Sequence, residues 1–470
     1  MTINNVDIDA TLNKVKVLLK EEKDLSPAVR SMIELLALVI TLLVGRLNLN
    51  SRNSSKPPSS DPNRKKESKA KGDRKAGGQK GRVGVTLQKV DDPDEIENIK
   101  LDRRKLPQER YREIGYESRQ VFDIDISRVV TEYRAQILED SKGNRFVAPF
   151  PEDVTKAVQY GKSVKAHSVY MSQFQLIPYN RIQDYFKEEL QIPVSIGSVF
   201  NFNREAYDLL STFEEKVKLK LIESMLMHVD ETSINVGGDR YWLHCTSNEL
   251  WTYFFSHERR GSVATDAIGI LPKFTGILCH DHWKPYYTYE CVHSLCNAHH
   301  LRELIRVWEQ DKQKWAKSMK ELLEEMNNAV NDAGGLLGSV ESKKYRHKYR
   351  EILKKAEAEC PLPDETQRKG KRGRMKRSKA RNLLERLRDF ENDVLRFLEN
   401  KIVPFTNNLG ENDIRMTKVQ QKISGCFRSM DGAKIFCRVR SYLSTCRKHD
   451  VTASKALNLL FQGKLPDFVN

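Results

Sequence analysis

Three acidic residues lie where carboxylates could converge on divalent metal ions. Asp230 ends an expected buried strand in "HVDET", Asp281 ends another in "LCHDHW", and Glu411 opens an expected helix in "TNNLGENDIRM". Carboxylates are the hard oxygen ligands that Mg²⁺ prefers. Two such ions, about 4 Å apart, activate a hydroxyl on one side of a phosphorus atom and stabilise the leaving oxygen on the other. We therefore predict that Asp230, Asp281 and Glu411 are catalytic residues and metal ligands, with two Mg²⁺ (or Mn²⁺) ions per active site.

Neighbouring acids offer alternatives to this set. An isolated aspartate at a strand end is more often a turn former, so position alone does not identify a ligand. Glu231 could replace Asp230, but the alternation of side chains along a strand points it to the opposite face. Asp239, in "GGD", has the setting of a hairpin turn, and Asp266 and Glu290 are weaker candidates for a fourth ligand.

The helix that begins near Glu411 carries a basic face. Arg415, Lys418 and Lys422 follow Glu411 at intervals of four, seven and eleven residues, which puts all four on one side of a helix. A solvated charged face would carry compensating acids, and this one has none. We predict that these three cations and Arg428 bind DNA backbone phosphates beside the metal ions.

The stretch "CVHSLCNAHH" contains a Cys-x-x-His pair, Cys296 and His299. Zinc normally takes four ligands, so this pair is half of a site, to which Cys291 or His293 could add a further ligand. We expect a structural or hydrogen-bonding role near the active site, with zinc binding as the alternative.

The charge balance of the chain indicates a polyanionic partner. Its 470 residues include 80 Lys and Arg against 64 Asp and Glu, a formal charge of +16. Nucleic acid is the commonest partner of such a surplus. A merely soluble basic protein is the alternative.

No secretion signal or membrane span is expected. The first sustained apolar stretch begins near Met32, and Leu35 to Val44 is shorter than the ~20 residues that a span needs. Eight cysteines lie between Cys245 and Cys446 without regular spacing, which favours reduced thiols. We expect a cytoplasmic, nucleoid-associated protein without a membrane partner.

The first 160 residues divide into three segments of different composition. Residues 1–50 predict two helices, and the second, Pro27 to Leu49, is apolar around most of its circumference. Such a helix must be covered, and we favour self-association through a short coiled coil over docking onto the chain's own body. Residues 51–90 are a basic linker expected to be disordered. Residues 91–160 alternate in short runs, which predicts a small β-rich module.

Residues 161–220 are helical in pattern, with the outline of a helix-turn-helix. Arg181 to Leu190 and Ile196 to Leu210 flank the break "QIPVS", and Ser195 could cap the second helix. Two ordinary packed helices would look the same. If the region binds DNA, its second helix would face base edges. The candidate contacts on that helix are Ser198, Asn201, Asn203 and Arg204.

The rest of the chain predicts an α/β core interrupted by an insertion. Residues 221–300 predict three hairpin-linked strands followed by alternating helices and strands, the order that an RNase H-like fold needs. Glu411 follows Asp281 by 130 residues, so a domain must be inserted, and the amphipathic helices and basic run of residues 301–400 supply it. Residues 401–470 complete the core with the Glu411 helix and C-terminal helices. The expected fold class is multidomain, mixed α/β.

These motifs together resemble the insertion sequence 66 family of transposases over nearly the whole chain. "NSSKPPSSD" with a following "GGQKG" is similar to the family's N-terminal linker, and "HVDET", "CHDHWKPY" and "CNAHHLREL" are similar to its catalytic motifs. The most specific stretch is "VPFTNNLGENDIRMTKVQQKISGCFRS". The resemblance implies a D-D-E triad on an RNase H-like fold with a helical insertion. Carried over, the triad is Asp230, Asp281 and Glu411.

The resemblance also implies the partners and shows one departure. It implies action on terminal inverted repeats and target DNA, with small accessory proteins of the same element. Typical members carry a four-cysteine zinc ribbon after the linker, but no Cys precedes Cys245 and no His precedes His167. The module at 91–160 therefore lacks thiolate and imidazole ligands for zinc.

The expected function is DNA cleavage and strand transfer by a metal-dependent transposase. At least a homodimer is expected, because two element ends must be cut together. One alternative is a catalytically inactive DNA-binding relic or regulator. Another is an RNase H-like nuclease without joining activity.

Overall fold

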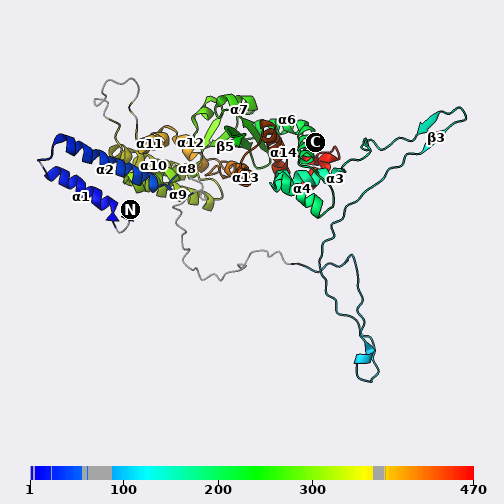
Figure 1. Cartoon of the computed structure of the whole chain (residues 1–470). Coiled ribbons are helices and arrows are strands. Elements are labelled where there is room, and N and C mark those ends of the chain that lie inside the picture. The colour runs from blue at the N-terminus through cyan, green and yellow to red at the C-terminus, as the bar shows by residue number, and fades with distance from the viewer. Residues whose placement is uncertain are drawn as a thin grey trace.

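The computed structural model describes residues 2–3, 6–22, 24–54, 61, 87–363, 375 and 377–469. Figure 1 shows an elongated arrangement with the sheet strand β5 near the middle, the N-terminal helices at one end and the C-terminus towards the other. The mixed α/β class expected from the sequence is confirmed. Most of the predicted linker at 51–90 lies outside the described residues.

A five-stranded mixed sheet positions the predicted catalytic residues. Its strand order is β7-β6-β5-β8-β9. β5, β6 and β7 pair as antiparallel hairpins, whereas β8 pairs parallel with β5 and β9 parallel with β8. This sequence of hairpins followed by crossovers agrees with the pattern expected from residues 221–300. The strands are β5 (Leu226–Val236), β6 (Asp239–Ser247), β7 (Thr252–His257), β8 (Ile277–His280) and β9 (Val292–Leu295).

Two long helices, α13 (Asn408–Ser424) and α14 (Met430–Lys448), pack on the hairpin side of the sheet. Ile414 of α13 joins one buried cluster with Ile234 of β5 and Leu243 of β6. Because alternate strand residues point to one face, this cluster identifies the face to which Asp230 also belongs. Burial of these side chains is what holds α13 against β5.

Helix α14 also supplies hydrogen-bond acceptors for backbone N–H groups of the edge strand β7. The hydroxyl of Ser441 accepts a hydrogen bond from the backbone N–H of Phe254, and that of Thr445 accepts from Thr252, at 2.8 and 3.1 Å. An edge strand otherwise presents unpaired backbone groups that invite pairing with another chain. Strand β7 is therefore closed by a helix.

A helical region lies between the extended segment and the sheet. Its apolar side chains share one buried cluster with α14 and the C-terminal helix. The predicted second helix of the helix-turn-helix outline begins as expected, because Ser195 Oγ accepts from Ser198 N–H at 3.0 Å. The helices are α3 (Lys162–Val169), continued by a π-helical turn (Tyr170–Phe174), α4 (Tyr179–Glu188), α5 (Ile196–Leu209), α6 (Ser211–Ile222) and α15 (Ala453–Phe461).

The segment between β9 and α13 is helical and has its own apolar cluster. Trp315, Met319 and Leu323 of one helix are almost fully buried in it, as are Leu384 and Leu387 of another. The glycine-containing stretch "GGLLGS" separates α9 from α10. The helices are α8 (Asn297–Asp311), α9 (Lys314–Asp332), α10 (Ser339–Glu359), α11 (Lys379–Asp389) and α12 (Glu391–Leu395).

The segment at 91–160 differs from the expected β-rich module. It holds one short hairpin, β3 (Ile137–Glu139) with β4 (Arg145–Val147), and a 3₁₀ turn. Apolar side chains that alternate along it, such as Val121 and Ile124, are 90% and 80% exposed. Alternation shows which side chains a strand would bury, but a strand forms only where a partner covers that face. Figure 1 shows this segment reaching away from the body.

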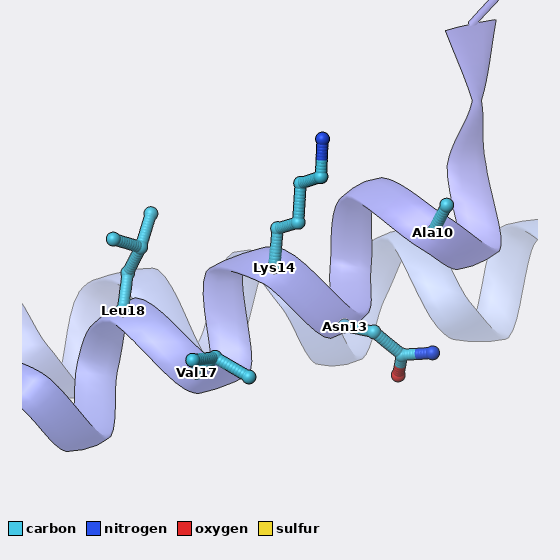
Figure 2. A pocket seen from close by; sticks show the side chains of 5 residues that line it. All are labelled: Ala10, Asn13, Lys14, Val17 and Leu18. Atoms are coloured by element: carbon cyan, nitrogen blue, oxygen red, sulfur yellow. The ribbon is translucent and has the colours of Figure 1, made fainter.

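The two N-terminal helices lie beside each other, and the described residues leave much of their outer surface uncovered. Figure 1 shows α1 (Ile8–Glu21) beside α2 (Pro27–Leu47), and the two are in contact. A shallow pocket of about 380 Å³ runs along one side of α1, lined by the five residues labelled in Figure 2. None of the three predicted catalytic carboxylates lines it.

The expectation of no membrane span rested on the short apolar stretch Leu35 to Val44, and helix α2 is longer than that stretch. It has 21 residues and by length and composition alone is long and apolar enough to cross a membrane. Core helices of soluble proteins and N-terminal signal sequences pass the same test. Only 11% of its most apolar window is buried, so most of its apolar surface is left uncovered by the described residues.

Candidate active site

Asp230 and Asp281 lie side by side on neighbouring parallel strands. The pairing of β5 with β8 runs from Leu226↔Ile277 to His228↔Cys279. Continued by two residues in the same register, it sets Asp230 opposite Asp281, directly after the last residue of β8. Such a site at the carboxyl end of parallel strands is where open α/β sheets commonly bind ligands.

The expectation that Asp230 ends its strand is wrong. Asp230 is the fifth residue of the 11-residue strand β5 and pairs with Cys245 of β6. The strand continues because β6 pairs with it from His228 to Val236, whereas β8 stops at His280. Asp230 thus lies where the parallel part of the sheet ends and only the hairpin goes on.

Glu411 reaches this edge from α13, and Asn407 fixes the start of that helix. Asn407, only 2% exposed, donates from Nδ2 to the carbonyl of Val229 at 2.8 Å and accepts at Oδ1 from Nδ1 of His228 at 2.7 Å. A Cβ on Gly410 would lie 3.4 Å from the Cβ of His228, so the glycine permits close approach of the helix to β5. These contacts place Glu411 over the strand that carries Asp230.

The site concentrates negative charge in a buried setting. Burial, and then the neighbouring carboxylates of Glu231, Asp281 and Glu411, raise the pKa of Asp230 well above its ordinary range. Adding a proton or a cation relieves both effects. The arrangement therefore favours uptake of positive charge between Asp230, Asp281 and Glu411.

The side chain of Glu231 lies on the other face of β5, as the alternation along the strand predicts, and it has hydrogen-bond partners there. Its side chain is 1% exposed and accepts hydrogen bonds from Nε of Arg260 at 2.8 Å and from the hydroxyl of Tyr286 at 2.6 Å. The Arg260 guanidinium in turn lies 4.9 Å from the ring centre of Trp242 and 4.6 Å from that of Trp283. Glu231 thus has a cationic and a hydroxyl partner.

The other acids considered from the sequence have local roles. Asp239 opens β6 after Gly237 and Gly238, whose φ values of 62° and 103° make the hairpin turn. Asp266 accepts a hydrogen bond from the hydroxyl of Tyr289 at 2.7 Å. Glu290 is exposed between the 3₁₀ turn and β9.

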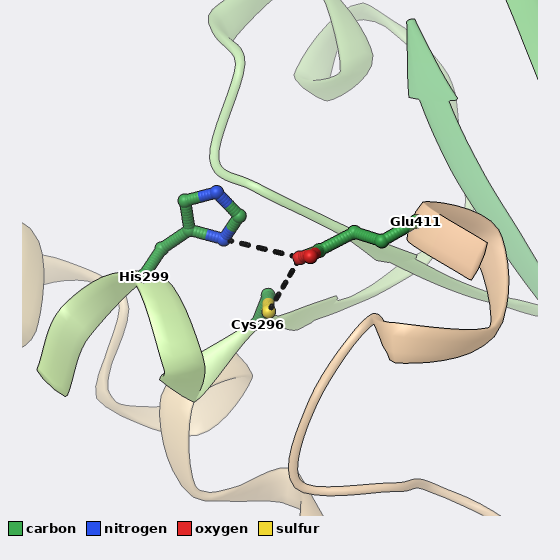
Figure 3. Close-up of side chains that lie close together, drawn as sticks. All are labelled: Cys296, His299 and Glu411. Carbon is green, nitrogen blue, oxygen red and sulfur yellow. Dashed lines mark hydrogen bonds and ion pairs between the residues drawn. The ribbon is translucent and has the colours of Figure 1, made fainter. Parts of the chain in front are cut away.

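Cys296 and His299 lie beside Glu411 (Figure 3). The thiol of Cys296 and Nδ1 of His299 are each 3.8 Å from Oε1 of Glu411. Arg302 lies 3.8 Å from the other carboxylate oxygen. Burial raises the pKa of Cys296 to about 11. Burial and then Arg302 lower the pKa of His299, which favours a neutral imidazole.

The predicted phosphate-binding cations lie along α13 and the turn that follows it. Nζ of Lys418 donates to the carbonyl of Ser233 at 2.8 Å, so the helix face at Lys418 meets β5. Burial and then Arg240 lower the pKa of Lys418, while Asp230 opposes this. Arg415, Lys422 and Arg428 are exposed.

The four candidates on α5 are in different environments. Asn203 is fully buried, accepts from Ser172 at 2.9 Å and donates to the hydroxyl of Tyr179 at 3.0 Å, so the expectation that it reaches DNA bases is wrong. Residues 201 and 203 lie about 200° apart around a helix, which is why Asn201 is exposed when Asn203 is not.

The remaining two candidates on α5 have protein partners. The hydroxyl of Ser198 lies 2.9 Å from that of Ser195. Arg204 pairs with Asp431 at 2.8 Å and is partly exposed.

Three residues at the site were not identified from the sequence. They are Asn407, His228 and Arg302. The "GENDIR" motif marks the helix start, but the partners of Asn407 lie 178 and 179 residues away. The available signal in the sequence was a polar residue, Asn407, directly before a first helix turn that contains a glycine.

Comparisons with known proteins agree with the resemblance of the motifs. Residues 157–435 match the family model described as Transposase IS66 family. This match covers more than half of the chain and includes all three carboxylates. Residues 10–88 match a family of unknown function (DUF6444). No curated protein matches the chain.

Proposed function

Because the chain belongs to the IS66 family of transposases, we propose that it is a DDE-type enzyme that binds terminal inverted repeats and catalyses DNA cleavage and strand transfer. The observation that carries the proposal is the raised pKa of the buried Asp230, to which the carboxylates of Asp281 and Glu411 contribute. The strand order β7-β6-β5-β8-β9 supports an RNase H-like core.

The residues at the site fit hard divalent cations. Three carboxylates supply oxygen ligands of the kind that Mg²⁺ and Mn²⁺ prefer. Their mutual repulsion and burial, which raise the pKa of Asp230, would be relieved by cations. Asp230 and Asp281 would hold both ions and Glu411 would complete one site. Bound there, the ions would activate the attacking hydroxyl and stabilise the leaving oxygen.

The chain's own cations would orient the DNA. Arg415 and Lys422 on the helix that carries Glu411, and Arg428 after it, are exposed and would contact backbone phosphates. Lys418, held at the carbonyl of Ser233, would lie nearest the carboxylates. These contacts are not sequence-specific, so recognition of element ends would need further contacts, for which Ser198, Asn201 and Arg204 of α5 remain candidates.

We expect assembly on DNA as a homodimer or larger species. The uncovered apolar surface of α2 supports self-association at the N-terminus. The partners would be inverted repeats, target DNA and small accessory proteins of the same element. The working compartment would be the cytoplasm, at the nucleoid.

A transposition assay in cells tests the function and its least obvious residue together. The gene with its native flanking DNA would be compared with Glu411→Gln and with Glu290→Gln, a matched exposed glutamate outside the triad. Movement by wild type and Glu290→Gln but not Glu411→Gln is expected. Movement by all three would reject Glu411 as a ligand.

The assay also separates the alternative functions. Nicked DNA without joined product would favour a nuclease of RNase H type. Salt-sensitive DNA binding with neither nicks nor joined product would favour an inactive regulator.

A further inference from the structure

A sulfur, a nitrogen and an oxygen donor atom lie close together at Glu411. Cys296 and His299 come from the start of α8, one turn apart, and Glu411 comes from α13. One ligand atom of each lies within 4.8 Å of the others. Figure 3 shows Nδ1 of His299 and the Cys296 sulfur both directed at the Glu411 carboxylate. The half site expected from the sequence therefore acquires a third donor from 112 to 115 residues further along the chain.

The imidazole of His299 has an unused position facing this cluster. Its Nδ1 is buried and has no hydrogen-bond partner among the described residues. The Glu411 oxygen at 3.8 Å is too far away for a hydrogen bond. A buried polar atom without a partner is costly, and coordination of a metal ion would satisfy it.

The distances are close to those of a tetrahedral zinc site. With Zn–S about 2.3 Å and Zn–N or Zn–O about 2.0–2.1 Å, ligand atoms lie about 3.6 Å apart for S and O and about 3.4 Å apart for N and O. The observed separations of both donors from Oε1 are 3.8 Å. A contraction of a few tenths of an ångström at the tips of side chains would close the site.

Neighbouring groups contact both the Cys296 sulfur and the Glu411 carboxylate. The backbone N–H of Asn407 donates to Sγ of Cys296 at 3.1 Å, which partly offsets the effect of burial on the pKa of this thiol. Arg302 approaches Oε2 of Glu411 at 3.8 Å, so its charge opposes a metal ion but leaves Oε1 free to bind one. Sulfur and imidazole donors select Zn²⁺ or Co²⁺ over Mg²⁺.

We propose that Cys296, His299 and Oε1 of Glu411 form a regulatory site for a zinc-class cation, with water as the fourth ligand. On binding, the Cys296 thiol loses its proton to solvent and its sulfur bonds to the metal. The ion holds Glu411 away from Asp230 and Asp281, so zinc inhibits the enzyme. The inhibitory consequence rests on the proposed function, whereas metal binding itself does not.

Cobalt titration of the full chain tests the binding site directly. Thiolate-bound Co²⁺ gives a sulfur-to-metal charge-transfer band in the near ultraviolet, and Zn²⁺ should abolish it by displacement. Cys296→Ser should remove the band, and His299→Ala should weaken Co²⁺ affinity by more than about tenfold. Cys291→Ser is the matched control, because that thiol lies 4.0 Å from Nε2 of His293 in a neighbouring Cys–His pair. A band that survives Cys296→Ser, or none in wild type, overturns the proposal.

Inhibition is measured separately as strand transfer in Mg²⁺ with increasing Zn²⁺, each variant relative to its own zinc-free rate. Wild type should lose activity at zinc concentrations at least about tenfold below those that affect Cys296→Ser. Equal sensitivity overturns the regulatory role. A chain with no strand transfer at all fails the proposed function, and the cobalt band still decides the metal site.

Discussion

The contacts of Asn407 predict a measurable loss of stability from a single truncation. Its amide nitrogen faces a carbonyl, which can only accept, so Oδ1 faces His228, and Nδ1 of that ring must carry the proton. Asn407→Ala leaves this N–H and the Val229 carbonyl without their side-chain partner in a buried site. Each such group costs about 1–3 kcal/mol, so the pair costs about 2–6 kcal/mol.

The expected change is large enough for a thermal melt. A loss of 1 kcal/mol shifts the midpoint of a 150–250-residue domain by about 2–4 °C, so the lower bound corresponds to about 4–8 °C. Differential scanning calorimetry of the full chain measures it. The matched control is Asn408→Ala, because that neighbouring asparagine is exposed at the first turn of the same helix.

The same substitution should impair transposition at a temperature where both variants are folded, since Asn407 positions the helix that carries Glu411. The reasoning is refuted if Asn407→Ala melts within about 1 °C of Asn408→Ala. Lowered stability with undiminished transposition would refute only the positioning role.

Four further predictions concern the electrostatics of the core and the DNA contacts. Because the pKa of Asp230 is raised in the folded state, the metal-free wild type should lose stability as the pH rises through this raised pKa. Without divalent metal, the Asp230→Asn variant should therefore have a higher melting temperature than wild type at neutral pH, and its melting temperature should depend less on pH. Lys448→Met should cost about 3–5 kcal/mol in denaturant unfolding, because it leaves Asp413, 2.7 Å from Nζ and largely buried, without its cation. In salt-dependent DNA titrations, Arg415→Ala should weaken binding and reduce the salt slope by about 1. Asn203→Ala should lower the melting temperature but leave DNA affinity unchanged, and a specific loss of affinity would restore it as a base contact.

Local patterns in the sequence were sufficient to predict a residue's role where that role depends on its neighbours in the chain. Ser195 caps α5 because the cap and the N–H that it accepts are three residues apart. Glu231 points away from Asp230 because side chains alternate along a strand. The order of strands around Asp230 and Asp281 followed from hairpin turns and from the lengths of the connecting segments. Membership of the transposase family was identified from motifs of this local kind.

Features that depend on packing between distant segments were decided only by the tertiary structure. Asn203 is buried because α5 packs against α3 and α4, and only this packing decides which face of α5 is covered. Within the described part of the chain, the alternating run at 91–160 forms a single short hairpin in place of the expected module, and much of its apolar side is exposed. Asn407 and His228, like Cys296 and Glu411, meet only after more than a hundred residues of chain have folded between them. The sequence by itself determined which residue types were available for chemistry, and the long-range contacts of α8, α13 and β5 decided which of them share one site.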